Sequence, residues 1–201
     1  LIRYQDQSAG PFRIGADVYQ RGVWQPTLET YLPVQMCHVE VRDVYRVWHG
    51  ACHLDDALQA PASREHFDGY RQGPKVLDGY QDNRHIPALN QGGWHDAGDY
   101  DLATGSQAGT TFTLALAAEE FGIRSDQTTV RKPQRQVVLH APDGVPDILQ
   151  QVANGVDILL SGYRVAGFSF AGIIENSLTQ YVHLGDAATM TDNRVYDSSL
   201  G

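Results

Sequence analysis

Residues 107–121, QAGTTFTLALAAEEF, carry the clearest helical pattern of the chain. Thr104 or Ser106 can cap the start of this helix, and Gly122 can end it. The middle of the segment, FTLALAA, is apolar on almost every side, so a helix there needs neighbours on several faces. We therefore predict that this helix lies deep in the protein, with Glu119 and Glu120 at a solvated edge.

Four other segments are also predicted to be helical. They are residues 24–33, 44–60, 145–163 and 173–185. The pattern is strongest after Pro142 and Gly144, where apolar side chains recur at helical spacing. Residues 61–93 are rich in Gly, Pro, Asp and Asn, which predicts a long loop of the kind that carries function. Alternating strand patterns are scarce, so we predict a mainly α fold.

Composition and charge exclude several kinds of partner. The chain has 201 residues, which suits one domain or a piece of a larger one. Its formal net charge of -9 would repel nucleic acid and anionic lipid. The densest basic run, RKPQR at 131–135, is interpreted as a solvated loop. No apolar run is long enough to predict a membrane span, and the start of the chain has no pattern of a signal sequence.

Two cysteines and two histidines offer the side chains that tetrahedral zinc prefers. These residues are Cys37, Cys52, His53 and His95. Their wide spacing excludes a compact zinc finger and leaves other interpretations open. The cysteines can instead be buried thiols or a disulfide, and His38 and His49 compete as ligands.

A cluster of carboxylates follows His95 in the segment GGWHDAGDYD. Asp96 and Asp99 are separated by Ala97 and Gly98, which permit a tight turn, so both carboxylates can grip one water molecule. An ionised carboxylate can take a proton from water that attacks an anomeric carbon.

Aromatic residues flank these carboxylates, and other interpretations of the acids remain open. Trp94 and Tyr100 are candidates for stacking on a sugar ring. The alternative for the acidic loop is a calcium-binding or helix-capping role. Asp55 and Asp56 are interpreted as solvated or helix-capping residues.

Three blocks together resemble the catalytic domain of glycoside hydrolase family 9, the inverting endoglucanases. The blocks are YLPVQMCHVEVRDVYRVWHGACHLDDA (31–57), NQGGWHDAGDYDLATGSQA (90–108) and PDGVPDILQQVANGVDILLSGY (142–163). The resemblance runs from about Pro11 to the end, with residues 1–20 as a lead-in from a preceding domain. It implies that residues 1–201 are the N-terminal part of an (α/α)6 barrel.

The resemblance also implies roles for residues of the two motifs. Asp99 matches the general base of the family, and Asp96 matches the residue that helps to hold the attacking water. The implied ligands of a structural zinc are Cys37, Cys52, His53 and His95. Zinc bound to His95 would anchor the backbone that leads into Asp96.

The family pattern also contains a general-acid glutamate in a late segment that this sequence does not show. The glutamates present are Glu29, Glu40, Glu65, Glu119, Glu120 and Glu175, and none has the matching context. We therefore expect the remainder of the catalytic domain as a partner, and no glucan hydrolysis by the chain alone.

The expected activity is inverting hydrolysis of β-1,4-glucosidic bonds in cellulose, xyloglucan or related β-glucans. The alternative is a non-catalytic carbohydrate-binding or zinc-stabilised protein that lacks the general acid. The inferred substrate predicts a secreted, periplasmic or cell-surface protein.

Overall fold

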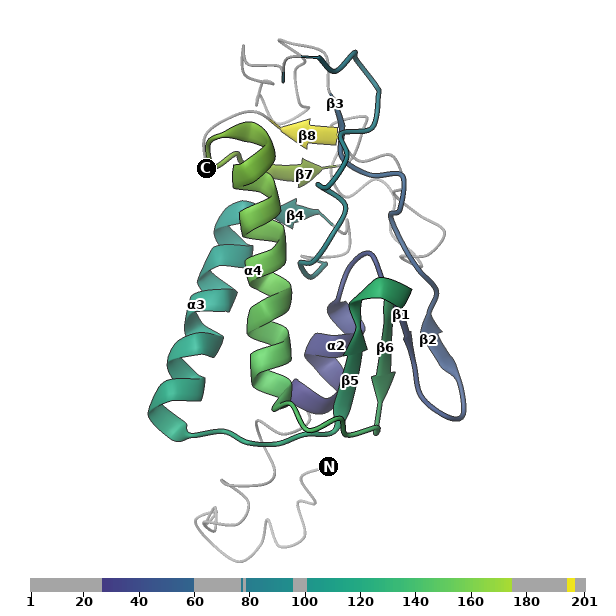
Figure 1. Cartoon of the computed structure of the whole chain (residues 1–201), viewed down its shortest axis with the longest axis vertical. Coiled ribbons are helices and arrows are strands. Elements are labelled where there is room, and N and C mark those ends of the chain that lie inside the picture. Colours follow the sequence, from purple (N-terminus) through teal and green to yellow (C-terminus); the bar gives the residue numbers. More distant parts are fainter. Residues whose placement is uncertain (1–26, 60–76, 78, 96–100, 175–194, 198–201) are drawn as a thin grey trace, which may run out of the picture.

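Two long helices lie side by side and are flanked by two small sheets (Figure 1). The computed structural model describes residues 27–59, 77, 79–95, 101–174 and 195–197. One sheet lies beside the lower half of α4 in Figure 1, and the other lies near its upper end. Within these residues the chain therefore combines helices with strands.

The two long helices are α3 (Thr104–Phe121) and α4 (Asp147–Ala166). Gly122 ends α3 with φ 57° and Gly167 ends α4 with φ 74°, a left-handed conformation that glycine adopts at little cost. Both helices confirm the predictions made for 107–121 and 145–163.

The first described segment forms a short helical stretch. A π-helical turn (Thr27–Tyr31) leads directly into α2 (Leu32–Gln35), and Pro33 lies in the first turn of α2. A proline is tolerated there because the first backbone N–H groups of a helix have no partner within it. The helical prediction for 24–33 is thus confirmed from Thr27 onward.

In the described part of the chain, eight short strands form two four-stranded sheets. The first has the order β2 (Val47–His49), β1 (Glu40–Arg42), β6 (Gln136–Leu139), β5 (Thr128–Arg131), with β1 and β6 parallel. The second has the order β3 (Leu58–Gln59), β8 (Val195–Asp197), β7 (Gly172–Ile174), β4 (Leu102–Ala103). A 3-10 turn (Lys132–Gln134) joins β5 to β6.

These strands correct several predictions. The helix predicted for 44–60 is wrong, because this segment contains β2 and β3. Of the helix predicted for 173–185, the first two residues lie in β7 and the rest fall outside the described residues. The mainly α prediction is not confirmed for the described part of the chain. Strands of two to four residues are too short to show a clear alternation.

Asp43 helps to turn the chain between β1 and β2. Its carboxylate accepts hydrogen bonds from the backbone N–H groups of Tyr45 and Arg46 at 2.6 and 2.8 Å. These backbone bonds lower the pKa of Asp43. A side chain that bonds its own backbone in this way favours a turn over a helix, which is one physical reason for the failed helix prediction.

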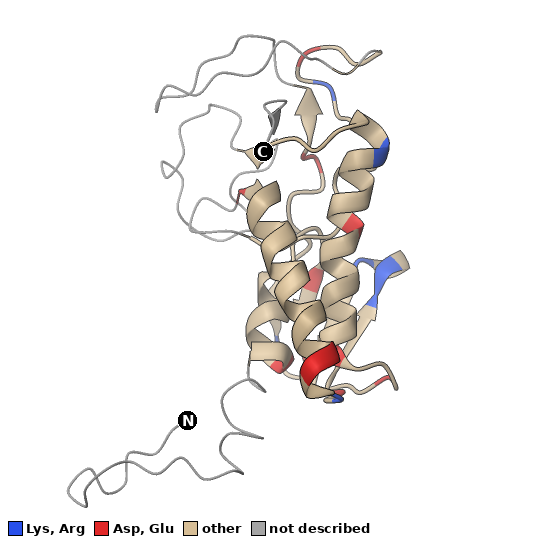
Figure 2. Cartoon of the chain, turned by 90° about the vertical axis from the view of Figure 1, so that its left-hand side faces the viewer, with Lys and Arg blue, Asp and Glu red and all other residues tan. Residues whose placement is uncertain are grey.

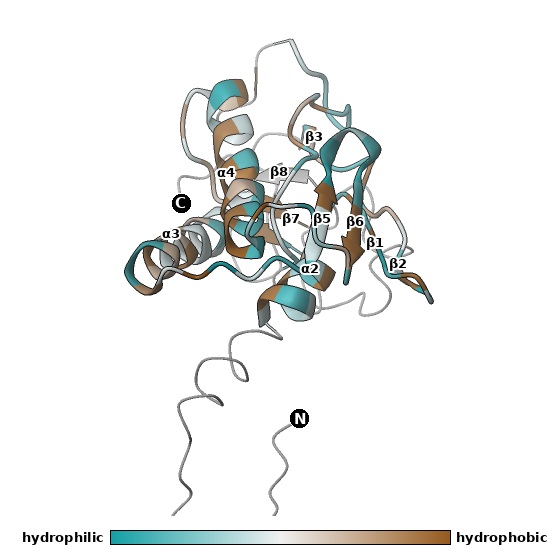
Figure 3. Ribbon diagram, turned by 60° about the horizontal axis from the view of Figure 1, so that its bottom comes forward, coloured by the Kyte–Doolittle hydropathy of each residue, from teal (hydrophilic) through white to brown (hydrophobic). Residues whose placement is uncertain are grey.

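The apolar core has two parts. One cluster joins α4 to the second sheet and contains Cys37, Cys52, Ala57, Ile86, Leu89, Leu102, Ile158, Phe170 and Ile173. The other joins α2 to the first sheet and contains Met36, Val41, Trp94, Val137 and Leu139. Hydrophobic residues are prominent in β6 in Figure 3. Leu114 of α3 also packs against the second cluster, so α3 borders the core along one side.

The predicted deep position of α3 is not found among the described residues. Its buried side chains are Gln107 and Thr111, whereas Phe112 and Phe121 are 69% and 75% exposed. The visible face of α3 is uncharged except near its end, where Glu119 and Glu120 are exposed as predicted (Figure 2). In the described structure α3 packs on α4 along one side and shows apolar residues on the other.

No helix among the described residues is long and apolar enough to span a lipid bilayer.

Asp147 connects the start of α4 to β5. Its side chain is fully buried and accepts hydrogen bonds from the backbone N–H groups of Gln127 and Thr128 and from the Thr128 hydroxyl. Burial raises the pKa of Asp147, while these hydrogen bonds favour the ionised form and oppose the rise. The carboxylate therefore satisfies backbone groups that would otherwise be buried without partners.

We predict that Asp147→Ala lowers the free energy of unfolding by about 2–3 kcal/mol, because it leaves two buried N–H donors unsatisfied. The exposed Glu119→Ala, as a control, should change it by less than about 0.5 kcal/mol. Urea unfolding followed by circular dichroism measures both variants. Equal stability of the two variants would contradict the assigned role of Asp147.

Candidate metal centre

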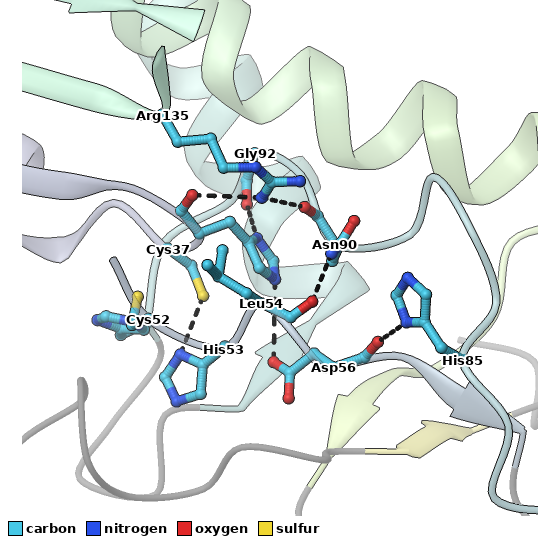
Figure 4. A network of polar contacts seen from close by, with 11 residues as sticks. Cys37, Cys52, His53, Leu54, Asp56, His85, Asn90, Gly92 and Arg135 are labelled. Atoms are coloured by element: carbon cyan, nitrogen blue, oxygen red, sulfur yellow. Dashed lines mark hydrogen bonds and ion pairs between the residues drawn. The ribbon is translucent and has the colours of Figure 1, made fainter. Parts of the chain in front are cut away.

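Two thiols and two imidazoles from separate segments meet in the interior. They belong to Cys37, Cys52, His53 and His95, and their ligand atoms all lie within 4.8 Å of one another. The sulfur of Cys37 is 3.3 Å from Nδ1 of His53, and the sulfur of Cys52 is 3.5 Å from Nε2 of His95. None of the four residues is more than 7% exposed. Figure 4 shows His53 pointing toward the sulfur of Cys37.

Backbone pairing holds two of these residues next to each other. The N–H of Cys37 donates to the carbonyl of Gly93 at 3.0 Å, and the N–H of His95 donates to the carbonyl of Gln35 at 2.8 Å. Met36 and Trp94 form an isolated β-bridge between the same stretches. The segment after α2 and the segment before Asp96 thus run as a short antiparallel pair.

The donor set fits a metal ion with tetrahedral preference. Thiolate and imidazole bind zinc at about 2.0–2.3 Å, which puts donor atoms about 3.3–3.8 Å apart. The two measured separations, 3.3 and 3.5 Å, lie in this range. Calcium prefers oxygen ligands, so this cluster does not fit it. The sulfurs of Cys37 and Cys52 are not joined in a disulfide, which removes that alternative.

The two competing histidines lie outside the four-residue group. His38 donates from Nδ1 to the carbonyl of Gly92 at 3.1 Å, and its Nε2 lies 3.8 Å from a carboxylate oxygen of Asp56. The ring of His49 is 5.8 Å from the ring of His95. Asp56 is fully buried, so its interpretation as a solvated or capping residue is wrong.

Trp94 connects residues 92–95, hereafter the cluster segment, to both long helices. Its indole N–H donates to Gln151 of α4 at 2.8 Å. Its backbone N–H and carbonyl both bond to the side chain of Gln107 of α3 at 2.9 Å. The side chain is only 4% exposed, so in the described structure it packs in the core and offers no face to a sugar ring. Its proposed sugar contact is thus corrected to a packing role.

The other sequence-predicted site residues, Asp96, Asp99 and Tyr100, lie outside the described residues. Their backbone, however, continues directly from His95. The described contacts therefore fix where this acidic segment begins.

Two glycines allow the cluster segment to press against α4. Gly92 and Gly93 have φ of 70° and 80°, and a Cβ on Gly92 would lie 2.5 Å from the carbonyl oxygen of Asn154. The side chain of Asn154 donates to the carbonyl of Gly93 at 2.9 Å. A Cβ at either glycine would therefore collide with α4.

The sequence interpretation missed several polar residues that hold this segment. Gln151 and Asn154 are buried on α4, where polar side chains on an otherwise apolar helix face would have signalled a buried network. Arg135 belongs to the basic run that was interpreted as solvated. It donates to the carbonyls of His38 and Asn90 at 3.4 and 3.0 Å (Figure 4). Arg135 is therefore half-buried, whereas the other residues of the run are exposed as predicted.

Comparisons with known proteins identify the family of this chain. Residues 31–196 match the family model described as Glycosyl hydrolase family 9, and the chain belongs to this family. Two curated sequences of Endoglucanase D from Acetivibrio thermocellus, one of them from strain ATCC 27405, are 26% identical over 176 residues. The match covers 81% of this chain and 24% and 23% of the relatives, so the chain spans about a quarter of their length.

A solved structure shares the fold. The crystal structure of a metagenome-derived glycoside hydrolase family 9 endoglucanase is similar with a TM-score of 0.54 and 22% sequence identity. The match covers 87% of this chain and 28% of that chain. The likeness places the described elements in part of the fold of that family.

Gly155 gives a test of the packing around Trp94. A Cβ there would lie 1.9 Å from the hydroxyl oxygen of Thr111 and 2.7 Å from the indole of Trp94. We predict that Gly155→Ala lowers the free energy of unfolding by about 1–3 kcal/mol because it forces α3 and Trp94 away from α4.

Gly109→Ala is the matched control, because it lies in α3 with nothing within 4 Å of the added Cβ. It should raise stability by up to about 1 kcal/mol through its better helix propensity. Thermal unfolding measures both variants. A stabilised Gly155→Ala would refute the close packing described here.

Proposed function

We propose that this chain supplies the catalytic base and a structural zinc centre to a family 9 glycoside hydrolase. The supporting observation is the position of His95. It lies in the buried cluster with Cys37, Cys52 and His53, and Asp96 follows it directly in the sequence. A metal ion held there would fix the starting point of the segment that carries Asp96 and Asp99.

The proposed reaction is hydrolysis of β-1,4-glucosidic bonds with inversion of configuration. Asp99 accepts a proton from a water molecule that Asp96 helps to hold, and the oxygen of that water attacks the anomeric carbon. A carboxylic acid from the remainder of the catalytic domain gives its proton to the leaving oxygen. Cellulose, xyloglucan and related β-glucans are the proposed substrates. Since such polymers are met outside the cytoplasm, we propose an exported protein.

The proposed ion is zinc, in a structural role. Two thiolates and two imidazoles complete a tetrahedral shell, so no coordination position is left for a reacting water molecule. The two thiolates also neutralise the charge of the ion, which suits a buried site. The contribution of this centre is then to fold stability and to the position of the loop.

A second candidate is a non-catalytic carbohydrate-binding or zinc-stabilised protein. It is favoured by the contacts of the described glutamates, none of which belongs to a metal-binding group of the described residues. Glu29 accepts a hydrogen bond from Ser125, Glu40 accepts one from Gln136, and Glu119 and Glu120 are exposed on α3. Turnover by the full-length protein decides between the two candidates.

We predict that a chelator lowers the thermal unfolding midpoint of the chain. An ion present at about 100 times its Kd stabilises the folded state by about 2.7 kcal/mol. Cys52→Ser should unfold at a lower temperature, and the chelator should lower its midpoint by less than it lowers that of the wild-type chain. The exposed His140, which has φ 55°, offers the control His140→Asn, because asparagine tolerates that conformation. An unchanged midpoint of the wild-type chain with chelator would refute the zinc centre.

For the reaction, we predict that Asp99→Asn in the full-length protein lowers kcat by about 10²–10⁴-fold, because the amide cannot accept the proton. KM for a soluble cello-oligosaccharide should change little. Asp82→Asn, at an exposed position, should leave both constants unchanged. Release of sugars measured at several substrate concentrations separates the two constants. Full activity of Asp99→Asn would contradict the base assignment.

A further inference from the structure

A second group of metal-binding side chains adjoins the proposed zinc cluster. It consists of Cys37, His38 and Asp56, and one ligand atom from each lies within 4.8 Å of the others. All three residues are buried, with exposed fractions of 0%, 1% and 0%. Cys37 belongs to both groups, so its sulfur lies between them. The ring of His38 bonds to the carbonyl of Gly92 through one nitrogen and lies near the carboxylate of Asp56 with the other.

The free ring nitrogen of His38 points to a ligand that is not part of the protein. Because Nδ1 donates to the carbonyl of Gly92, the neutral ring carries its lone pair on Nε2. That atom is buried and has no hydrogen-bond partner among the described residues. An oxygen of Asp56 is 3.8 Å away, which is too far for a hydrogen bond. A proton on Nε2 would make no hydrogen bond across this gap, whereas a metal ion between the two groups would bind both.

The backbone of His38 gives independent support. Its φ is 64°, a left-handed conformation that is unfavourable for residues with a Cβ. Glycine would adopt this conformation with less strain. Arg135 and the N–H of Cys37 hold the chain on both sides of this position through contacts with the carbonyls of His38 and Gly93. A strained backbone that keeps a buried histidine indicates a role for the imidazole.

The distances come close to coordination of one ion. Zinc bonds to nitrogen and oxygen of about 2.0–2.2 Å place two tetrahedral ligand atoms about 3.3–3.6 Å apart. The Nε2 to oxygen distance of 3.8 Å is slightly longer, so a bound ion would draw the two side chains together. Thiolate, imidazole and carboxylate are all established zinc ligands.

We propose that Cys37, His38 and Asp56 form a second binding position for a divalent transition metal such as Zn²⁺, with the Cys37 sulfur bridging the two ions. The three protein donors leave one coordination position for a water molecule. This second position depends on the proposed zinc centre only because the two sites share Cys37 as a ligand. Its own ligands, His38 and Asp56, do not belong to the first site.

Metal stoichiometry of the full chain tests the proposal. The metal-free chain, prepared without oxygen, is titrated with Zn²⁺ and measured by native mass spectrometry and elemental analysis. The wild-type chain and the control His140→Asn should bind two zinc ions. His38→Gly and Asp56→Asn should each bind one. The glycine variant is expected to fold because glycine suits φ 64° at this position.

The outcomes separate this site from the first one. His95→Ala should lose an ion that His38→Gly retains. Saturation of the wild-type chain at one ion, with the same value for His38→Gly, would overturn the second position and leave the first intact. Two ions retained by His38→Gly would also overturn it, because the second ion would then lie elsewhere. A chain that binds no zinc at all would refute both sites.

Titration with Co²⁺ gives a second readout. A bridging Cys37 thiolate predicts that the second equivalent of Co²⁺ changes the sulfur-to-cobalt absorption set by the first. In His38→Gly that change should be absent, while the spectrum of the first equivalent should be kept. A second equivalent that leaves the charge-transfer absorption of the wild-type chain unaltered would overturn the shared sulfur.

Discussion

The short antiparallel pairing between residues 35–37 and 93–95 is the contact on which the site depends. Two backbone hydrogen bonds join these stretches, from Cys37 to Gly93 and from His95 to Gln35. The pairing brings a thiol and an imidazole together although the residues lie far apart in sequence. It also places the chain that precedes Asp96 against α4, where Asn154 and Gln151 hold Gly93 and Trp94. A buried polar network of this kind fixes one register, because every slip leaves amide groups unsatisfied.

The family assignment suggests a reason for the buried cluster next to the acidic loop. In a family 9 hydrolase the position of the catalytic carboxylates has to be reproducible, since a misplaced base loses most of its effect. Sulfur and nitrogen ligands from three separate segments would give the start of the acidic loop this precision. The burial of all four side chains would keep water from competing for a bound ion. The same burial explains why Trp94, next to His95, serves packing.

The sequence predicted the parts of this protein that depend on local pattern. Helix periodicity identified α3 and α4, and the glycines after them marked their ends. The four residues of the metal cluster were identified by ligand chemistry and by resemblance to a family. The strands escaped because they are very short and are stabilised by distant partners, as in the pairing of β1 with β6. His38, Asp56 and Arg135 escaped for a similar reason, because their environment is created only when remote segments meet.

The central claim is that two thiolates and two imidazoles hold one ion at the start of the acidic segment. X-ray absorption at the zinc edge of the full chain, loaded with one equivalent of zinc, tests it most directly. The account predicts a first shell of two sulfur atoms at about 2.3 Å and two nitrogen atoms at about 2.0–2.1 Å. A first shell made only of oxygen and nitrogen, without sulfur, would contradict it.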